Sequence, residues 1–361
     1  MMIPTEPIGS IPRPPELVAA VRAGAAPREL APLLDEAVRA TVAAFEACGA
    51  PVISDGEQGK FENFWSYPVH GAANTASDGF RIPLENGAAT GAHHRMPRLT
   101  RGPFRYQRYA DEYVRAARVH ATLPLKQAII SPSALSLLYP PEGIDGYSRE
   151  QFLDDLVREH ETEIRRCLEA GAHKVQIDFA EGPLAMQLDP SGALLASFVH
   201  LNNLALGRFS AAERALIGLH VSPLGMRPLA ADGATPAQVD YADLLPSLFE
   251  IRAGNFYIAM AGQPDPERVL RIARDYARPE QSVFVGVIDP GNPQVETAHQ
   301  VCERVLLAAA YVPRHRLGTT DDAGFAPFFD DVSVSRATAF AKVGARVEGT
   351  RMAARLLEGV A

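Results

Sequence analysis

The sequence has little of several features that define other classes of protein. Three cysteines in 361 residues are too few for a disulfide framework. Cys48, Cys167 and Cys302 each lie in a segment with helical periodicity, so we interpret them as small core residues. No apolar run approaches the roughly 20 residues that span a bilayer, and the N-terminal segment lacks the basic and apolar regions of a signal peptide. We therefore expect a cytoplasmic protein.

An excess of positive charge and a nucleotide-binding glycine motif are also missing. The formal net charge is −8 at pH 7, which argues against nucleic acid or an anionic membrane as a partner. No G-x-G-x-x-G segment follows an expected strand, so a dinucleotide-binding fold has no support. A small-molecule substrate is the better expectation, and a homo-oligomer is left open.

What is present is a regular alternation of short apolar segments and longer amphipathic ones. The expected strands are Ile8–Arg13, Val52–Glu57, Leu125–Ser131, Lys174–Ala180, Ala215–Ser222, Gly254–Met260, Val283–Asp289 and Arg316–Asp322. The expected helices are Leu30–Gly49, Phe104–Thr122, Ser148–Gly171, Ala196–Phe209, Gln238–Ala253, Pro266–Ala277, Gln294–Tyr311 and Val332–Leu357.

Eight strand–helix units predict an α/β fold of the (β/α)8 TIM-barrel class, because parallel strands with right-handed helical crossovers close into a ring at that number. We expect a single barrel domain over residues 1–361 with a long βα loop at about 67–103. An open, doubly wound sheet is the alternative. His93 and His94 of the loop either face the substrate or lie among solvated residues.

Polar residues occur at the C-terminal ends of the expected strands. Barrel enzymes carry their reacting groups at that edge, so residues far apart in the sequence would form one site. A single Asp or Ser there can instead form a turn or cap a helix. The residues concerned are Ser10, Asp55, Glu57, Ser131, Asp178, His220, Ser222, Asp289, Asp321 and Asp322.

Four short motifs follow one another along nearly the whole chain. They are IGSIPR at Ile8–Arg13, DGEQ at Asp55–Gln58 with FENF at 61–64, VQID at Val175–Asp178, and GVID at Gly286–Asp289 with Glu-Thr at 296–297. Together they resemble the catalytic domain of the cobalamin-independent methionine synthases and their short single-domain relatives.

The resemblance implies an amino-acid substrate. In that family, backbone amides of the I-G-S turn hold the carboxylate of homocysteine, and carboxylates of the D-G-E and Q-I-D motifs hold its ammonium group. The matching residues are Gly9, Ser10, Glu57 and Asp178. Turn N–H groups suit an anion and two carboxylates suit a primary ammonium. We expect these residues, with Ser222, to bind an amino-acid-like ligand.

The same resemblance shows that the family's zinc ligands are mostly lost. HVS at 220–222 stands where the family has His-x-Cys, and Ala323 stands where it has a second Cys before Gly-Phe. The family's Glu ligand has no acidic counterpart in residues 255–264. One imidazole and one hydroxyl do not hold zinc well, so we expect no metal cofactor. Replacement donors are the alternative: His93, His94, Asp321 or Asp322.

Three functions fit these residues, and a metal-independent methyl or alkyl transferase acting on an amino-acid-like or thiol substrate ranks first. His220 would be its general base, because a free thiol is mostly protonated at neutral pH. Asp289 stands near the position of a family His that protonates the leaving nitrogen of a folate donor, and a folate donor remains open but unsupported. The alternatives are a metal-free lyase or decarboxylase, using His220 with Asp178 or Asp322, and a non-catalytic amino-acid binder. The predicted catalytic residues are His220, Asp289 and Asp322.

Overall fold

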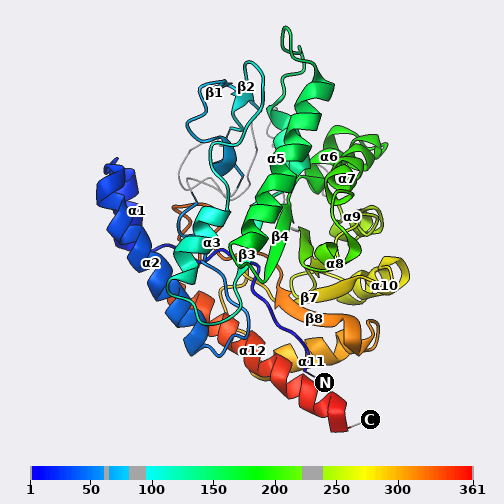
Figure 1. Ribbon diagram of the computed structural model, residues 1–361. Coiled ribbons are helices and arrows are strands. Elements are labelled where there is room, and N and C mark those ends of the chain that lie inside the picture. Colours follow the sequence, from blue (N-terminus) through cyan, green and yellow to red (C-terminus); the bar gives the residue numbers. More distant parts are fainter. Residues whose placement is uncertain (1, 61–64, 81–94, 222–238, 360–361) are drawn as a thin grey trace, which may run out of the picture.

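Six consecutive parallel strands form the central sheet of the computed structural model, which describes residues 2–60, 65–80, 95–221 and 239–359. They lie in chain order, and helices cover the outer side of the sheet (Figure 1). The strands are β3 (Lys126–Ile130), β4 (Lys174–Phe179), β5 (Ile217–Val221), β6 (Asn255–Ile258), β7 (Ser282–Ile288) and β8 (Leu317–Asp321).

The helices alternate with these strands, as the sequence predicted. The α-helices are α1 (Pro15–Arg22), α2 (Pro27–Ala47), α3 (Asp111–Arg118), α4 (Pro132–Leu135), α5 (Arg149–Glu169), α6 (Gly182–Leu188), α7 (Ala193–Leu206), α8 (Ala211–Arg214), α9 (Tyr241–Leu248), α10 (Pro266–Tyr276), α11 (Ala298–Ala309) and α12 (Arg336–Gly359). The short 3-10 helices are η1 (Tyr67–Val69), η3 (Ser136–Leu138) and η4 (Arg314–Arg316). No helix in this part of the chain is long and apolar enough to cross a membrane.

Two N-terminal segments complete the ring, each through a single bridge. Thr5 pairs in parallel with Thr319 of β8, and Ile53 pairs in parallel with Leu125 beside β3. The two segments also join each other, since the N–H of Ile11 donates to the carbonyl of the Gly56 residue at 3.0 Å. The predicted (β/α)8 barrel is confirmed, and an open sheet is excluded by this closure.

The first strand is shifted from its predicted position. The sequence placed it at Ile8–Arg13, but the pairing occurs at Thr5 and residues 8–13 form no strand. Residues 8–13 instead form a loop that follows the paired segment, and Gly9 in this loop has a φ of 157°. The apolar run predicted the correct region of the chain but not the residue that pairs, because a single bridged residue leaves no alternating pattern in the sequence.

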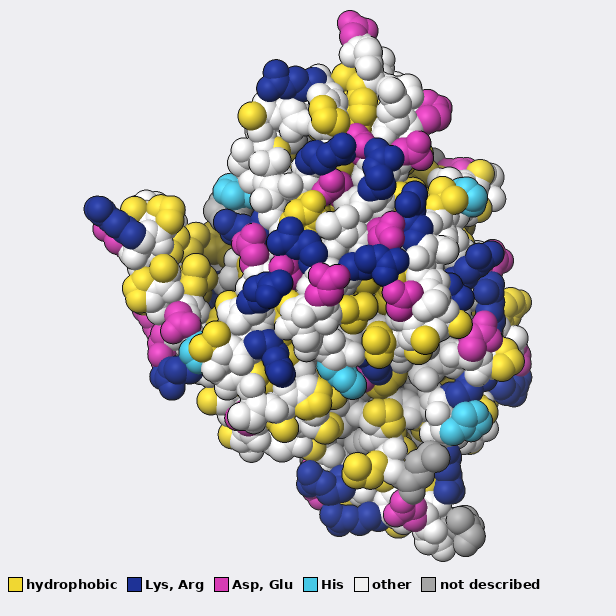
Figure 2. All heavy atoms as spheres, viewed as in Figure 1, with side chains coloured by type: hydrophobic (Ala, Val, Ile, Leu, Met, Phe, Trp, Pro, Cys, Tyr) yellow, Lys and Arg dark blue, Asp and Glu magenta, His cyan; other side chains and the backbone are white. Residues whose placement is uncertain are grey.

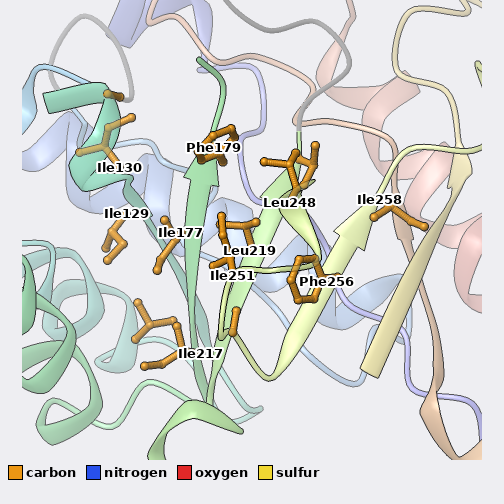
Figure 3. Packing of buried hydrophobic residues seen from close by; sticks show 14 of the residues in the cluster. Ile129, Ile130, Ile177, Phe179, Ile217, Leu219, Leu248, Ile251, Phe256 and Ile258 are labelled. Atoms are coloured by element: carbon orange, nitrogen blue, oxygen red, sulfur yellow. The ribbon is translucent and has the colours of Figure 1, made fainter. Parts of the chain in front are cut away.

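Alternation along the strands decides which side chains face the helices. Ile177, Leu219 and Phe256 belong to one large apolar cluster with helical residues such as Leu248 (Figure 3). Successive strand residues point to opposite faces, so Asp178, His220 and Tyr257, which are partners in the strand register, point into the ring. The polar positions of the central strands therefore meet inside the barrel.

The predicted loop at 67–103 contains η1 and a small antiparallel ribbon of β1 (Thr75–Ala76) and β2 (Arg98–Leu99). The chain that follows is held by carboxylates on one face of α5: Glu159 Oε2 accepts from the N–H of Tyr106 and Glu163 Oε1 from that of Ala110, both at 3.1 Å. His93 and His94 lie outside the described residues. The single-domain boundaries stay a prediction.

The face shown in Figure 2 mixes basic and acidic side chains over α5 and its neighbours. Among the charged side chains of α5, Glu161 pairs with both Arg165 and Arg208. No single sign of charge dominates the face that this view shows.

Candidate active site

Asp178 and His220 form a pair at the C-terminal ends of β4 and β5. The two residues are register partners, and His220 Nδ1 lies 3.1 Å from Asp178 Oδ1. Gln176 Nε2 donates to the same oxygen at 2.8 Å and to the carbonyl of Ile8 at 3.0 Å. Because Gln176 and His220 both contact Oδ1, the Asp178 carboxylate is fixed in one orientation.

The second ring nitrogen of His220 has a weaker contact. Nε2 lies 3.4 Å from the carbonyl oxygen of Asp322, a distance at the long limit for a hydrogen bond. When Nδ1–H donates to a carboxylate, Nε2 carries the lone pair and can accept a proton. The arrangement therefore suits general acid–base chemistry at Nε2, oriented by Asp178.

Glu57 and Lys60 form a buried ion pair in the turn after the second barrel segment. Lys60 Nζ lies 3.3 Å from Glu57 Oε2, and the residues are 2% and 6% exposed. Glu57 has a φ of 56°, a left-handed conformation that is uncommon outside glycine. Arg13 holds this turn by donating to the carbonyl oxygens of Glu57 and Gln58 at 2.9 and 3.0 Å.

The Glu57 carboxylate lies against the Gly9 turn. A Cβ atom at position 9 would stand 2.7 Å from Glu57 Oε1, so the close approach requires glycine. Burial raises the pKa of Glu57 to about 7, Lys60 opposes this effect, and the carboxylates of Asp178 and Asp55 add to it. Gly9, Glu57 and Asp178, which the sequence predicted to bind an amino acid, thus lie in one region, and their role stays a prediction.

Ser10 ties this region to the loop after β8. Its hydroxyl accepts from the N–H of Ala326 at 3.2 Å, and its carbonyl accepts from that of Phe325 at 3.0 Å. A Cβ atom at Gly324 would overlap Ser10 Oγ, which explains the glycine of the Gly-Phe motif. The Ser10 side chain has this structural role, so its predicted contact with a substrate carboxylate depends on the backbone N–H.

Both carboxylate oxygens of Asp322 are held by the backbone that follows β6. Oδ1 accepts from the N–H groups of Met260 and Ala261 at 2.9 and 3.0 Å, and Oδ2 accepts from Gly262 at 2.6 Å. Burial raises the pKa of Asp322 to about 7, while these three donors lower it. The contacts favour a structural role, and the catalytic role of Asp322 stays a prediction.

Asp289 and Asp321 have partners of a different kind. Asp289 Oδ1 accepts from the N–H of Gly291 at 2.9 Å, which is the turn-forming role that the sequence left open. Asp321 forms a buried ion pair with Arg346 of α12, outside the ring. The Asp321 side chain is therefore directed to α12, although its neighbour Asp322 contacts His220 through its carbonyl oxygen.

A pocket of about 480 Å³ lies between α9, α10 and the loops after β7 and β8. Its nearest documented link to His220 is Asp322, a lining residue whose carbonyl oxygen lies 3.4 Å from His220 Nε2. Asp289 and Asp322 line it, and Gly262 separates them at one wall. Arg268 also lines the pocket, and it forms ion pairs with Asp240 and Asp243. The site thus has two parts, the Gly9–Glu57–Asp178 region and this pocket, and His220 contacts Asp178 of the first and Asp322 of the second.

Two residues of the site were not singled out from the sequence, and one predicted residue cannot be placed. Gln176 lies inside the Q-I-D motif, whose Asp alone was interpreted, and Lys60 is one of only four lysines in the chain. That rarity was the signal that could have marked Lys60. Ser222 lies outside the described residues.

The zinc-binding arrangement implied by the resemblance does not fit the residues that the structure describes. Among them, no three His, Cys, Asp or Glu side chains are grouped to hold a metal ion. His220 Nδ1 faces Asp178, and the Asp322 carboxylate accepts three backbone hydrogen bonds. Ala323 supplies no donor atom, so His220 has no partner ligand in this part of the chain.

Fold and site together define a (β/α)8 barrel protein with paired carboxylates and a histidine at the C-terminal edge of its strands. No family model matches the chain. A methionine synthase from Saccharolobus solfataricus is 24% identical over 358 residues, which cover 97% of this chain and 95% of that protein.

Solved structures show the same fold. A B12-independent methionine synthase from Shewanella sp. W3-18-1, in complex with selenomethionine, has a TM-score of 0.73 at 17% identity and covers 99% of this chain and 100% of its own. A methyltransferase from Methanosarcina mazei has a TM-score of 0.56 at 14% identity, covering 97% and 94%. The resemblance to the cobalamin-independent methionine synthases, predicted from four motifs, is confirmed.

Proposed function

We propose that the protein is a methionine-synthase-like enzyme, a metal-independent methyl or alkyl transferase that acts on an amino-acid-like thiol. The Asp178–His220 pair beside the Glu57 carboxylate is the observation that carries the proposal, because it combines a proton acceptor with an ammonium site. The selenomethionine bound to the Shewanella relative supports an amino-acid ligand. A lyase and a non-catalytic binder remain alternatives without an observation of their own.

The geometry suits both polar groups of an α-amino acid. Its carboxylate would accept from the backbone N–H groups of Gly9 and Ser10, and its ammonium would face Glu57 Oε1, which already touches the Gly9 backbone. The carboxylate and the ammonium group are bonded to the same carbon atom of an amino acid, so their two binding sites must lie side by side. Asp178 would add a second carboxylate to the ammonium site.

His220 would remove the proton of the acceptor thiol. Nε2 accepts the proton, and Asp178 stabilises the imidazolium that forms. The thiolate sulfur then attacks the alkyl carbon of the donor, and the bond between that carbon and the leaving group breaks with its electron pair on the leaving group. General base catalysis replaces the thiol activation that zinc supplies in the family.

The pocket lined by Asp289 and Asp322 would hold the alkyl donor. Its described lining carries four aspartates, Asp240, Asp265, Asp289 and Asp322, and one arginine that is already paired. This balance of charge disfavours an anionic group and suits a neutral or cationic donor. A cationic donor also leaves as a neutral molecule, so its departure needs no acid.

The proposal is tested by His220→Asn. We expect turnover with a thiol amino acid such as homocysteine to fall by roughly 10²–10⁴-fold, since that is the usual contribution of general acid–base catalysis, with little change in selenomethionine affinity or thermal unfolding. Calorimetric titration and a methyl-transfer assay over a panel of neutral and cationic donors give these values.

Two controls separate the steps of this proposal. Glu57→Gln should instead weaken selenomethionine binding, because it removes the charge that faces the ammonium. Activity of His220→Asn within a few-fold of the parent would leave His220 a packing residue and contradict the mechanism.

A further inference from the structure

Lys60 is a buried cation beside the proposed ammonium site. The residue is 2% exposed, its Nζ lies 3.3 Å from Glu57 Oε2, and it stands 5.4 Å from the centre of the Tyr67 ring. Burying an ammonium is costly unless a charged partner compensates it. Glu57 supplies that partner, and Asp178 and Asp55 also face Lys60 closely enough to raise its pKa against the effect of burial.

The two oxygens of the Glu57 carboxylate have different surroundings. Oε2 faces Lys60, whereas Oε1 faces the Gly9 backbone, where a substrate ammonium would arrive. The backbone of the turn cannot shift easily, because Arg13 donates to the carbonyl oxygens of both Glu57 and Gln58. A cation at Oε2 therefore fixes the direction in which Oε1 points.

We propose that Lys60 is a positioning residue that favours the ionised form of Glu57 and keeps its carboxylate turned toward the Gly9 turn before any ligand binds. This inference depends on the proposed function for the identity of the ligand, but not for the state of Glu57. Lys60 touches only the far oxygen of Glu57, so it acts through that carboxylate rather than on the substrate.

The charge balance explains why such a residue is useful. Asp178 and Asp55 both lie close enough to raise the pKa of Glu57 beyond the effect of its burial, because like charges in a buried region favour the protonated carboxyl. A protonated Glu57 would lose most of its attraction for an ammonium group. Among the charged side chains that face Glu57, Lys60 and Arg13 oppose this protonation, and Arg13 is committed to backbone carbonyls.

The test uses Lys60→Met, which keeps the length of the side chain and removes its charge. Isotope-edited infrared spectroscopy of ligand-free protein follows the Glu57 carboxyl, identified by its absence in Glu57→Gln. We expect the midpoint of its titration to rise by at least one pH unit in Lys60→Met. For a rise of one unit, selenomethionine affinity at pH 7 should fall about fivefold, because the ionised fraction of Glu57 falls from about a half to about a tenth, and most of that loss should be recovered by pH 8.5.

Lys60→Arg is the matched control, since it keeps the charge and should leave the midpoint within half a pH unit of the parent. An unchanged Glu57 midpoint in Lys60→Met overturns the inference. Equal weakening of selenomethionine at both pH values overturns it too, because that pattern indicates a purely structural role. A shifted midpoint in a protein whose parent binds no amino acid supports the role of Lys60 and contradicts the proposed function.

Discussion

The inside of the barrel ring and the layer between the ring and its helices are equally buried but differ in chemistry. The outer layer consists of aliphatic and aromatic side chains such as Ile177, Leu219 and Phe256. Inside the ring, Ile8, Tyr257 and Phe284 form a small apolar cluster, and the charged residues Lys126, Lys174 and Glu6 lie against it. Burial alone therefore does not make a core apolar, provided that the polar groups have partners.

The polar interior is a connected set of contacts around Glu6. Lys174 Nζ donates to Glu6 Oε1 at 2.7 Å, and the Tyr257 hydroxyl donates to Oε2 at 2.6 Å. Lys126 Nζ lies 3.8 Å from Glu6 Oε2 and donates to Gln176 Oε1 at 2.7 Å. Because Gln176 also donates to Asp178, this network continues to the Asp178–His220 pair.

The four lysines of the chain share one kind of environment. Lys60 pairs with Glu57, Lys126 and Lys174 with Glu6, and Lys342 with Glu296. All but Lys174 are at most 2% exposed. Each lysine thus compensates the charge of a carboxylate that would otherwise be buried without a partner.

Glu6→Gln gives the largest expected effect on stability and tests the polar interior most directly. We expect the free energy of unfolding to fall by about 3–5 kcal/mol, because removing one partner leaves buried charges uncompensated. Urea denaturation measures the loss, and Glu36→Gln, in an exposed pair with Arg39, is the matched control with little change. A loss as small as that of the control would show that the interior charges do not support one another.

Lys126→Met tests the same region through its pH dependence. Burial lowers the pKa of Lys126 to about 7, and Glu6 opposes this effect. Between about pH 7 and the unfolded value of ~10.4 the unfolded chain binds more protons at this residue than the folded chain, so Lys126 makes stability rise with pH in that window. We expect the urea midpoint of Lys126→Met to rise less between pH 7 and 9 than that of the parent. Identical slopes would contradict a lowered pKa.

Ile177→Val gives the smallest effect and tests the outer layer. Removing one buried methylene should lower the free energy of unfolding by about 0.5–1.5 kcal/mol. Selenomethionine affinity should stay unchanged, because Ile177 faces the helices while its neighbour Asp178 faces the site. A change in selenomethionine affinity without a change in the free energy of unfolding would contradict the separation of the outer layer from the site.

The sequence could predict the order of elements because their periodicities are local. Seven of the eight expected strands contain residues that pair in the barrel. The first expected strand, Ile8–Arg13, does not, because its part of the chain pairs at Thr5. The candidate residues on β4 and β5 were also accessible, since Asp178 and His220 end two neighbouring strands. The order of the strands is enough to predict that these two residues lie next to each other.

The partner of each polar side chain was decided by the folded chain. Asp321 and Asp322 are neighbours in sequence, yet one pairs with Arg346 of α12 and the other with backbone amides after β6. Adjacent strand residues point to opposite faces, so a one-residue difference in register exchanges their surroundings. Composition and motifs therefore indicated the barrel and its relatives, whereas contacts such as Lys174 with Glu6 and Lys126 with Gln176 were decided only when residues distant in sequence met inside the ring.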